Sequence, residues 1–274
     1  MKHNLLSRLR LSGWYYLLGA LLLLLGVPFY QLLVLNPLDY NAILSNQGNS
    51  HFAFYLAWIS NHTLQYMIYR SLLIAAFVLL LTLPFNLFRI IVAQEIVDQQ
   101  ERADEEPDQD DEDDQAEAEQ MGEDGMPPYA WRGKGFAVIA AWAGLSGLVA
   151  YILGAVIGTL YILAVSKSTA VPGSFTILYN IFSITSNTLG IGLLALSTLF
   201  FGALIARRGR NLWPMVWILF GYMALAVAAL LSGSAVAVAG APSEQATLTT
   251  PAFLLFGLWV VWLGIMLVRL KPEK

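Results

Sequence analysis

The sequence predicts an all-α integral membrane protein, a bundle of six transmembrane helices with both termini in the cytoplasm. Three observations indicate this fold class. Of the 274 residues, 57% are hydrophobic and only 12% are charged, about half the charged fraction of a soluble domain. Six apolar stretches are long enough to cross a hydrocarbon layer of roughly 30 Å, which takes about 20 helical residues. Lysines and arginines gather on one predicted side.

The first apolar stretch runs from Leu11 to Leu35 behind a basic leader. It is longer than the roughly 7–15 apolar residues of a signal peptide, and no small-x-small cleavage pattern follows it, so we interpret it as an uncleaved helix. The second stretch lies between Arg70 and Arg89. Each arginine is expected to reach the head groups while its aliphatic stem stays in lipid. The predicted spans are approximately 13–35, 68–90, 135–165, 175–206, 213–239 and 251–269.

Basic residues predict the orientation. With the N-terminus inside, 13 of the 15 lysines and arginines lie on the cytoplasmic side, and only Arg70 and Lys167 lie opposite. Because cytoplasmic loops carry the excess of positive charge, both termini are predicted to be cytoplasmic. The expected location is a cytoplasmic (inner) membrane, with the lipid bilayer as the first partner.

Acidic residues concentrate in the predicted cytoplasmic loop, residues 94–134. Of 19 carboxylates, 16 lie between Glu95 and Asp124. Neighbouring charges there are closer than the Debye length of about 8 Å, and few apolar side chains offset their repulsion, so the loop is predicted to be disordered. It divides the chain into a two-helix unit, 1–93, with an aromatic outer loop, and a four-helix unit, 135–274.

The acidic run 98–124 has two open interpretations. It is a solvated spacer, or it binds a basic cytoplasmic protein electrostatically. Asp108, Asp110, Glu112 and Glu119 fit part of a calcium-loop template. Asp111 stands where that template requires glycine, so a calcium site is not expected. No nucleic-acid partner is expected either.

The third span carries a helix-packing face. Gly144, Gly147, Tyr151, Gly154 and Gly158 recur at spacings of three and four, so they share one side of a helix. The last two glycines form a GxxxG element, which lets two helix backbones approach closely. Such motifs occur both within one chain and at dimer interfaces. Packing within this chain is the favoured interpretation.

The fourth span is the most polar. Thr176, Asn180, Ser183 and Asn187 share a face at helical spacing. Amides in hydrocarbon must find hydrogen-bond partners, so both asparagines are expected to face protein or water. Two interpretations remain open: hydrogen bonding between helices, and the polar lining of a substrate site.

Two further features are local. The segment HFAFYLAWI, residues 51–59, is rich in aromatic side chains. It is predicted to lie along the outer membrane surface or to cap the bundle. Pro28 and Pro84 can each kink a helix, because proline removes a backbone donor.

The absent motifs restrict the function. The chain has no cysteine, its three histidines are predicted outside the hydrocarbon, and no nucleotide-binding or nucleophile motif occurs. Accordingly, no catalytic, cofactor or metal residues are expected. The leading hypothesis is a non-enzymatic accessory, scaffold or assembly subunit of a membrane complex. The alternative is a transport component, either a permease subunit or a carrier for a small neutral or apolar solute.

Overall fold

The computed structural model describes residues 2–44, 51–105, 134–168, 171–208, 214–240 and 242–269. Every regular element in this part of the chain is helical. Helical runs long and apolar enough to cross a membrane number six and confirm the predicted count: Leu9–Leu38, Thr63–Gln94, Gly135–Ser166, Phe175–Arg207, Met215–Val236 and Thr249–Val268. Helices suit this environment because they satisfy their own backbone hydrogen bonds in lipid.

Several spans combine more than one helical element. In chain order the described elements are α1 (Lys2–Leu21), η1 (Leu22–Gly26), α2 (Val27–Tyr30), η2 (Gln31–Leu35), η3 (Asn36–Leu38), α3 (Tyr40–Leu44), α4 (His51–Asn61), α5 (Thr63–Leu79), α6 (Leu83–Glu105), α8 (Lys134–Ser166), α9 (Phe175–Ser183), η5 (Ile184–Gly190), α10 (Ile191–Arg208), α11 (Met215–Gly240) and α12 (Pro242–Val268). Here η1, η2 and η5 are π-helical, and η3 is a 3₁₀ turn.

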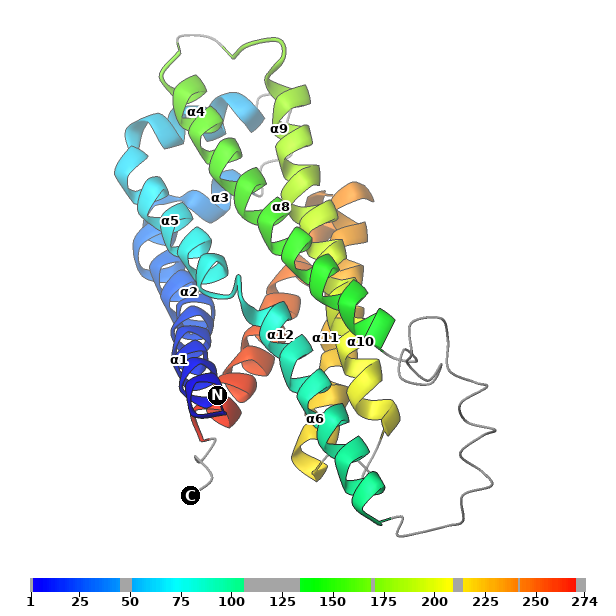
Figure 1. Ribbon diagram of the computed structural model, residues 1–274. Coiled ribbons are helices and arrows are strands. Elements are labelled where there is room, and N and C mark those ends of the chain that lie inside the picture. Colours follow the sequence, from blue (N-terminus) through cyan, green and yellow to red (C-terminus); the bar gives the residue numbers. More distant parts are fainter. Residues whose placement is uncertain are drawn as a thin grey trace.

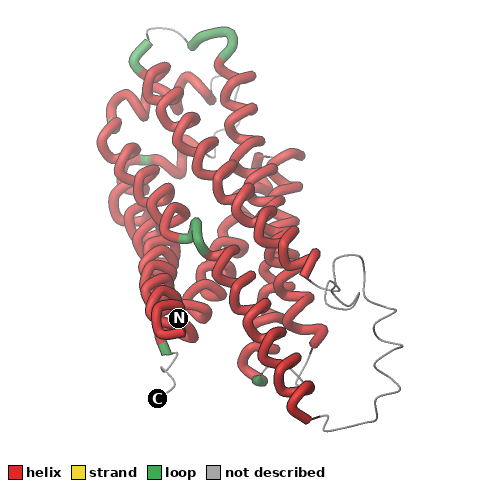
Figure 2. The backbone as a smooth tube through the Cα atoms, in the orientation of Figure 1, coloured by secondary structure: helices red, strands yellow, loops and turns green. Residues whose placement is uncertain are grey.

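The long helices run lengthwise through the bundle, tilted against one another, whereas α3 and α4 lie across it (Figures 1 and 2). At one end of the bundle lie α4 and the start of α9, and at the other end α1 begins and both α6 and α12 end. The first and last spans pack side by side, and α8 contacts α5, α6, α9 and α10. The long α8 therefore joins the second span to the fourth.

Both predicted proline sites change the helix, in different ways. Before Pro28 the chain widens into the π-helical η1, where the Val27 amide bonds to the Leu22 carbonyl, a way to accommodate the missing proline donor. Before Pro84 the second span breaks, and α5 ends at Leu79 while α6 begins at Leu83. Tight backbone bonds cross this break, among them Leu83 N–H to the Leu80 carbonyl at 2.9 Å.

Two apolar clusters hold the bundle together. We call the first the central core; its largest fully buried members include Phe77, Phe220, Phe256 and Trp259. The Phe220 and Trp259 rings stack with centroids 5.0 Å apart. The second, the α4-end cluster, is rich in tyrosine and comprises Leu35, Tyr40, Tyr55, Leu56, Trp58, Ile59, Tyr66, Ile162, Val165 and Phe175.

Helix α4 caps one end of the bundle, one of the two arrangements predicted for it. Its Tyr55, Trp58 and Ile59 side chains are buried, and the helix contacts α3, α5 and α8. The Trp58 indole N–H also donates to the Leu38 carbonyl. These contacts attach the aromatic segment to the bundle itself.

The acidic segment differs in part from the prediction of disorder. Helix α6 continues to Glu105, so residues 98–105 are helical. The backbone hydrogen bonds of the helix extend from the apolar span into the first acidic turns. The remainder of the segment, with the partial calcium template, lies outside the described residues.

Candidate functional site

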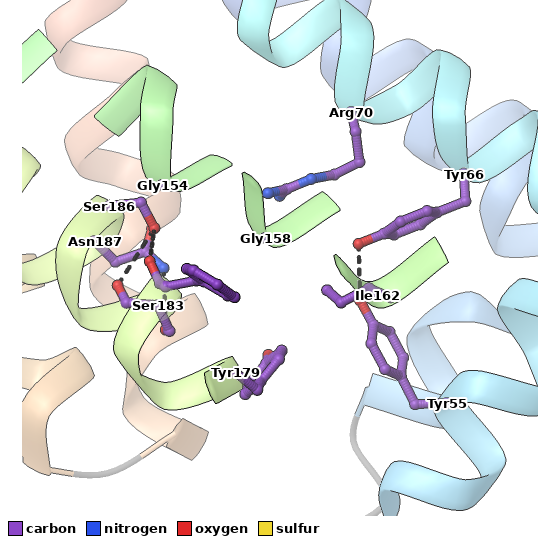
Figure 3. Close-up of a pocket in the computed structure, with 11 residues that line it drawn as sticks. Tyr55, Tyr66, Arg70, Gly154, Gly158, Ile162, Tyr179, Ser183, Ser186 and Asn187 are labelled. Carbon is purple, nitrogen blue, oxygen red and sulfur yellow. Dashed lines mark hydrogen bonds between the residues drawn. The ribbon is translucent and has the colours of Figure 1, made fainter. Parts of the chain in front are cut away.

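A small polar cavity lies at the α4 end of the bundle (Figure 3). Its volume is about 80 Å³, enough for a few water molecules or one small polar group. Helix α8 forms its back, α5 and the fourth span form its sides, and α4 contributes one residue. The lining residues are Tyr55, Tyr66, Arg70, Gly154, Gly158, Ile162, Tyr179, Phe182, Ser183, Ser186 and Asn187.

Arg70 is the one charged side chain in this lining. Its Nε–H donates to the Thr159 hydroxyl at 2.9 Å, and Nη2 donates to the Ala155 carbonyl at 3.5 Å. The Thr159 hydroxyl in turn donates to that same carbonyl. The guanidinium of Arg70 therefore turns toward acceptors on α8 and points into the cavity, rather than away from the bundle (Figure 3).

Arg89, the other arginine that brackets the second span, behaves differently. It lies on α6 beyond the helix break, and its side chain is exposed. The two arginines bracket the second span in the sequence, but their environments differ. Arg70 lines the polar cavity, and Arg89 lies on the surface. We use this difference below as a control.

Tyrosines form the wall of the cavity nearest α4. The Tyr55 and Tyr66 hydroxyls lie 3.2 Å apart and share one hydrogen bond, and Tyr179 approaches from α9 (Figure 3). The Phe52 ring of α4 contacts the rings of Phe175 and Tyr179, so α4 spans from α5 to α9 over this end. Burial raises the pKa of the Tyr55 phenol well above its ordinary value, with the neighbouring Tyr66 adding to the shift.

The predicted polar face of the fourth span is divided between two environments. Ser183 and Asn187 line the cavity, and the Asn187 amide donates to the Ser183 hydroxyl at 3.3 Å. Thr176 and Asn180 are exposed instead. Both exposed residues lie in the α-helical α9, ahead of the π-helical η5 that begins at Ile184.

The prediction from α-helical spacing missed Ser186, which the π-helical stretch places in the lining. Its hydroxyl donates to the Phe182 carbonyl at 2.9 Å. The π-helical stretch therefore contributes two of the polar lining residues, Ser186 and Asn187. Such π-helical turns occur frequently at functional sites.

The glycine face of α8 lies against the fourth span. A Cβ at Gly147 would come within 2.7 Å of the Gly190 carbonyl oxygen, and one at Gly154 within 3.0 Å of Ser186. Gly158 faces Phe182 in the same way, whereas Gly144 faces Pro84 and Ser197. These contacts lie within one chain. The face thus packs two helices closely and, at its Gly154 and Gly158 end, forms the back of the cavity.

Tyr151, the remaining member of that face, is directed elsewhere. It is buried in the central core, where its ring centroid lies 4.1 Å from that of Phe77. Phe77 lies about two helical turns from Arg70 along α5, on the side away from α4.

The lining is suited to binding rather than to proton transfer. It offers guanidinium, phenol, hydroxyl and amide groups, and no carboxylate or imidazole. Among the described residues, no group of three or more His, Cys, Asp or Glu side chains is placed to hold a metal ion. A second cavity of about 320 Å³ lies between α4 and the end of α8, and its lining carries no charge: Ala53, Leu56, Ala57, Ser60, Asn61, Val165, Ser166, Ser168 and Val171.

The prediction from sequence did not include Tyr55, Tyr66, Arg70 or Tyr179 in a site. One signal was available: Tyr66 and Arg70 are four residues apart, so they share a helix face inside an apolar segment. An ionisable residue in such a segment usually faces the protein interior. No protein-family model, curated protein or solved structure matches this chain.

Proposed function

We propose that this multi-pass helical membrane protein is a non-enzymatic, ligand-binding accessory or assembly subunit of a membrane complex. The observation that supports this function is the convergence of polar groups on one cavity. Tyr55 of α4, Arg70 of α5 and Asn187 of the fourth span come from three helices, yet all three line it. Because polar groups inside a membrane are costly unless they are used, such convergence is typical of a binding site.

The proposal of a non-enzymatic role rests on the chemistry of the lining. General acid–base catalysis needs a group whose protonation changes near neutral pH, most often histidine or a carboxylate. The lining contains neither. Its Ser186 hydroxyl donates to a backbone carbonyl, and the groups around it offer no base to activate it.

The transport alternative receives less support from the geometry. Helix α4 contacts α9 at one end of the cavity, and toward the other end Phe77 and Tyr151 pack together in the central core. The arrangement resembles a pocket more than a path across the bilayer. A cationic lining also suits a neutral or apolar solute poorly, since such a solute leaves the charge unpaired.

We propose further that the end of the bundle opposite α4 faces the cytoplasm in an inner membrane. The excess of lysine and arginine supports this orientation, and α1 begins and α6 ends at that same end (Figure 1). The acidic run 98–124 is then available to a basic cytoplasmic protein. Binding of that partner is expected to weaken as salt is raised, since charge attraction is screened.

Two asparagines of the same helical run provide the test of the binding role. The full chain is purified from native membranes in mild detergent, and retained small molecules and subunits are identified by native mass spectrometry. Asn187→Leu, which alters the cavity, is expected to lose the retained molecule. Asn180→Leu, which changes an exposed position, is expected to keep it.

Equal retention by the two variants, or no retained molecule in the unmodified protein, would contradict a ligand-binding role. A stoichiometric ATPase in the same preparation would favour the transport alternative instead. A larger complex without an ATPase supports the accessory role.

A further inference from the structure

We propose that the cavity receives the anionic head group of a membrane amphiphile, with Arg70 as its charge partner. This inference rests on the proposed binding function and adds the chemical class of the ligand. The chemistry required is a phosphate oxyanion without a neighbouring cation of its own. It could come from an anionic phospholipid or from free phosphate, and the experiment below separates these sources.

The first support is the unpaired charge. In the described part of the chain, the acceptors of Arg70 are a threonine hydroxyl and a backbone carbonyl, both neutral. The only described carboxylate side chain is that of Asp39, and it does not line the cavity. A guanidinium has five N–H donors in a planar fork that matches an oxyanion. An anion in the cavity supplies both the missing charge and the missing acceptors.

The second support is that the neighbouring groups retain donors. The Tyr55 and Tyr66 hydroxyls share one hydrogen bond, so only one of their two hydrogens is used and the other is available to a ligand. The Ser183 hydroxyl accepts from Asn187, and its own hydrogen is likewise available. These groups face the cavity from opposite sides (Figure 3). Donors on several sides suit a tetrahedral phosphate better than an apolar ligand.

The third support is the depth of the cavity. Helix α8 has 33 residues and is about 50 Å long, so it exceeds a hydrocarbon layer of roughly 30 Å by about 10 Å at each end when centred. Arg70 and its partner Thr159 each lie about two turns, or 10 Å, from the α4 end of their helices. This level is the boundary where lipid phosphates begin.

The fourth support is the size and the surroundings of the cavity. A volume of about 80 Å³ accommodates a phosphate group and no acyl chain. The side chains of Tyr179 and Phe182 are only partly buried, and Ile177 and Ile181 on the same helix are exposed. An acyl chain can therefore lie on the apolar outer surface of α9 while its phosphate occupies the polar interior.

The test compares the two arginines of the second span. The full chain is placed in nanodiscs of phosphatidylcholine alone or with phosphatidylglycerol. The protein is then released from the nanodiscs, and the lipids that stay bound to it are counted by native mass spectrometry. The unmodified protein is expected to retain phosphatidylglycerol over phosphatidylcholine. Arg70→Gln is expected to reduce that preference about tenfold, a typical effect of losing a charge-assisted pair. Arg89→Gln, at an exposed position, is expected to leave it unchanged.

Free phosphate is tested separately, by titrating inorganic phosphate into protein in nanodiscs of phosphatidylcholine and measuring the shift in thermal unfolding. A shift that Arg70→Gln abolishes, without retained phosphatidylglycerol, supports the oxyanion site and identifies a soluble source. Retention of phosphatidylglycerol without a phosphate shift identifies the lipid.

The inference is overturned if the unmodified protein prefers neither phosphatidylglycerol nor phosphate. This arm needs no variant, so it holds even if Arg70→Gln does not fold. It is also overturned if Arg70→Gln and Arg89→Gln lower the preference equally. If Asn187→Leu still loses a co-purified neutral molecule, the binding function stands and only the anionic ligand is wrong; if it loses nothing, both fail.

Discussion

The central core and the α4-end cluster are built on opposite principles. The central core consists mainly of close-packed apolar groups, such as the stacked Phe220 and Trp259 rings. The α4-end cluster includes Tyr55 and Tyr66, whose hydroxyls hydrogen-bond to each other, and it borders a cavity with a guanidinium. The difference predicts which substitutions destabilise each cluster. In the central core the loss of packed volume should cost most, and in the α4-end cluster the loss of hydrogen-bond partners.

The largest expected effect is in the central core. Trp259→Ala is expected to lower the free energy of unfolding by about 3 kcal/mol, because it leaves a cavity among tightly packed rings. Trp142→Ala is the matched control: its side chain is 58% exposed whereas Trp259 is fully buried, so its cost is expected to stay near 0.5 kcal/mol. Unfolding by detergent titration measures both. Equal losses would remove the distinction between buried and exposed tryptophans.

Adding volume to the glycine contacts is the next largest change. Gly147→Ala is expected to cost about 1–3 kcal/mol, because the new methyl group collides with backbone atoms of the fourth span. Gly135→Ala introduces the same group where nothing lies within 4 Å, and it is expected to be neutral or slightly stabilising. Thermal unfolding in matched nanodiscs gives the comparison. A stable Gly147→Ala protein would contradict the close packing of α8 on η5.

In the α4-end cluster, Tyr66→Phe sharpens the contrast by removing only a hydroxyl. The expected cost is about 1 kcal/mol, since the Tyr55 hydroxyl loses its hydrogen-bond partner within the cluster. Tyr222→Phe is the control, because that side chain is 58% exposed. The same unfolding assay applies, and an unchanged Tyr66→Phe midpoint would show that polar pairing does not hold this end.

The smallest effect is confined to alkaline pH. Burial raises the pKa of the Tyr55 phenol well above its ordinary value near 10. The unfolded chain releases this proton near pH 10 while the folded protein keeps it, so stability is retained below that pH and declines as pH rises further. The decline in stability between pH 9 and 11 is expected to be shallower in Tyr55→Phe. Identical slopes in the two proteins would contradict the burial of this phenol.

The number of spans was predictable from sequence, whereas the rotation of the helices was not. Hydropathy located the second span between Arg70 and Arg89, but that segment is apolar on all sides, so periodicity does not reveal which way Arg70 points. The direction of the Arg70 side chain depends on its hydrogen bonds to Thr159 and to the Ala155 carbonyl on α8. The position of α8 beside α5 is set by tertiary packing, which the local sequence does not reveal.

The polar face of the fourth span was predictable in part. The spacing of Ser183 and Asn187 identified two residues that line the cavity. Asn180 shares the α-helical α9 with Ser183, yet it is exposed while Ser183 lines the cavity. Helical spacing predicts which residues share a face, but which of them reach the cavity depends on how the helix packs against α8.

The close backbone approach of Gly147 to Gly190 fixes α8 against the fourth span. One wall of the cavity is therefore preorganised, and the opposite wall is adjustable. Two helices that touch through backbone atoms cannot rotate or slide past each other without collision, so Gly154, Ser186 and Asn187 stand on a rigid frame. The opposite wall, with Tyr66 and Arg70, is attached by side-chain hydrogen bonds. Ligands of different shape are thus accommodated by movement of the Arg70 and Tyr66 side chains, while the wall with Ser186 and Asn187 keeps its geometry.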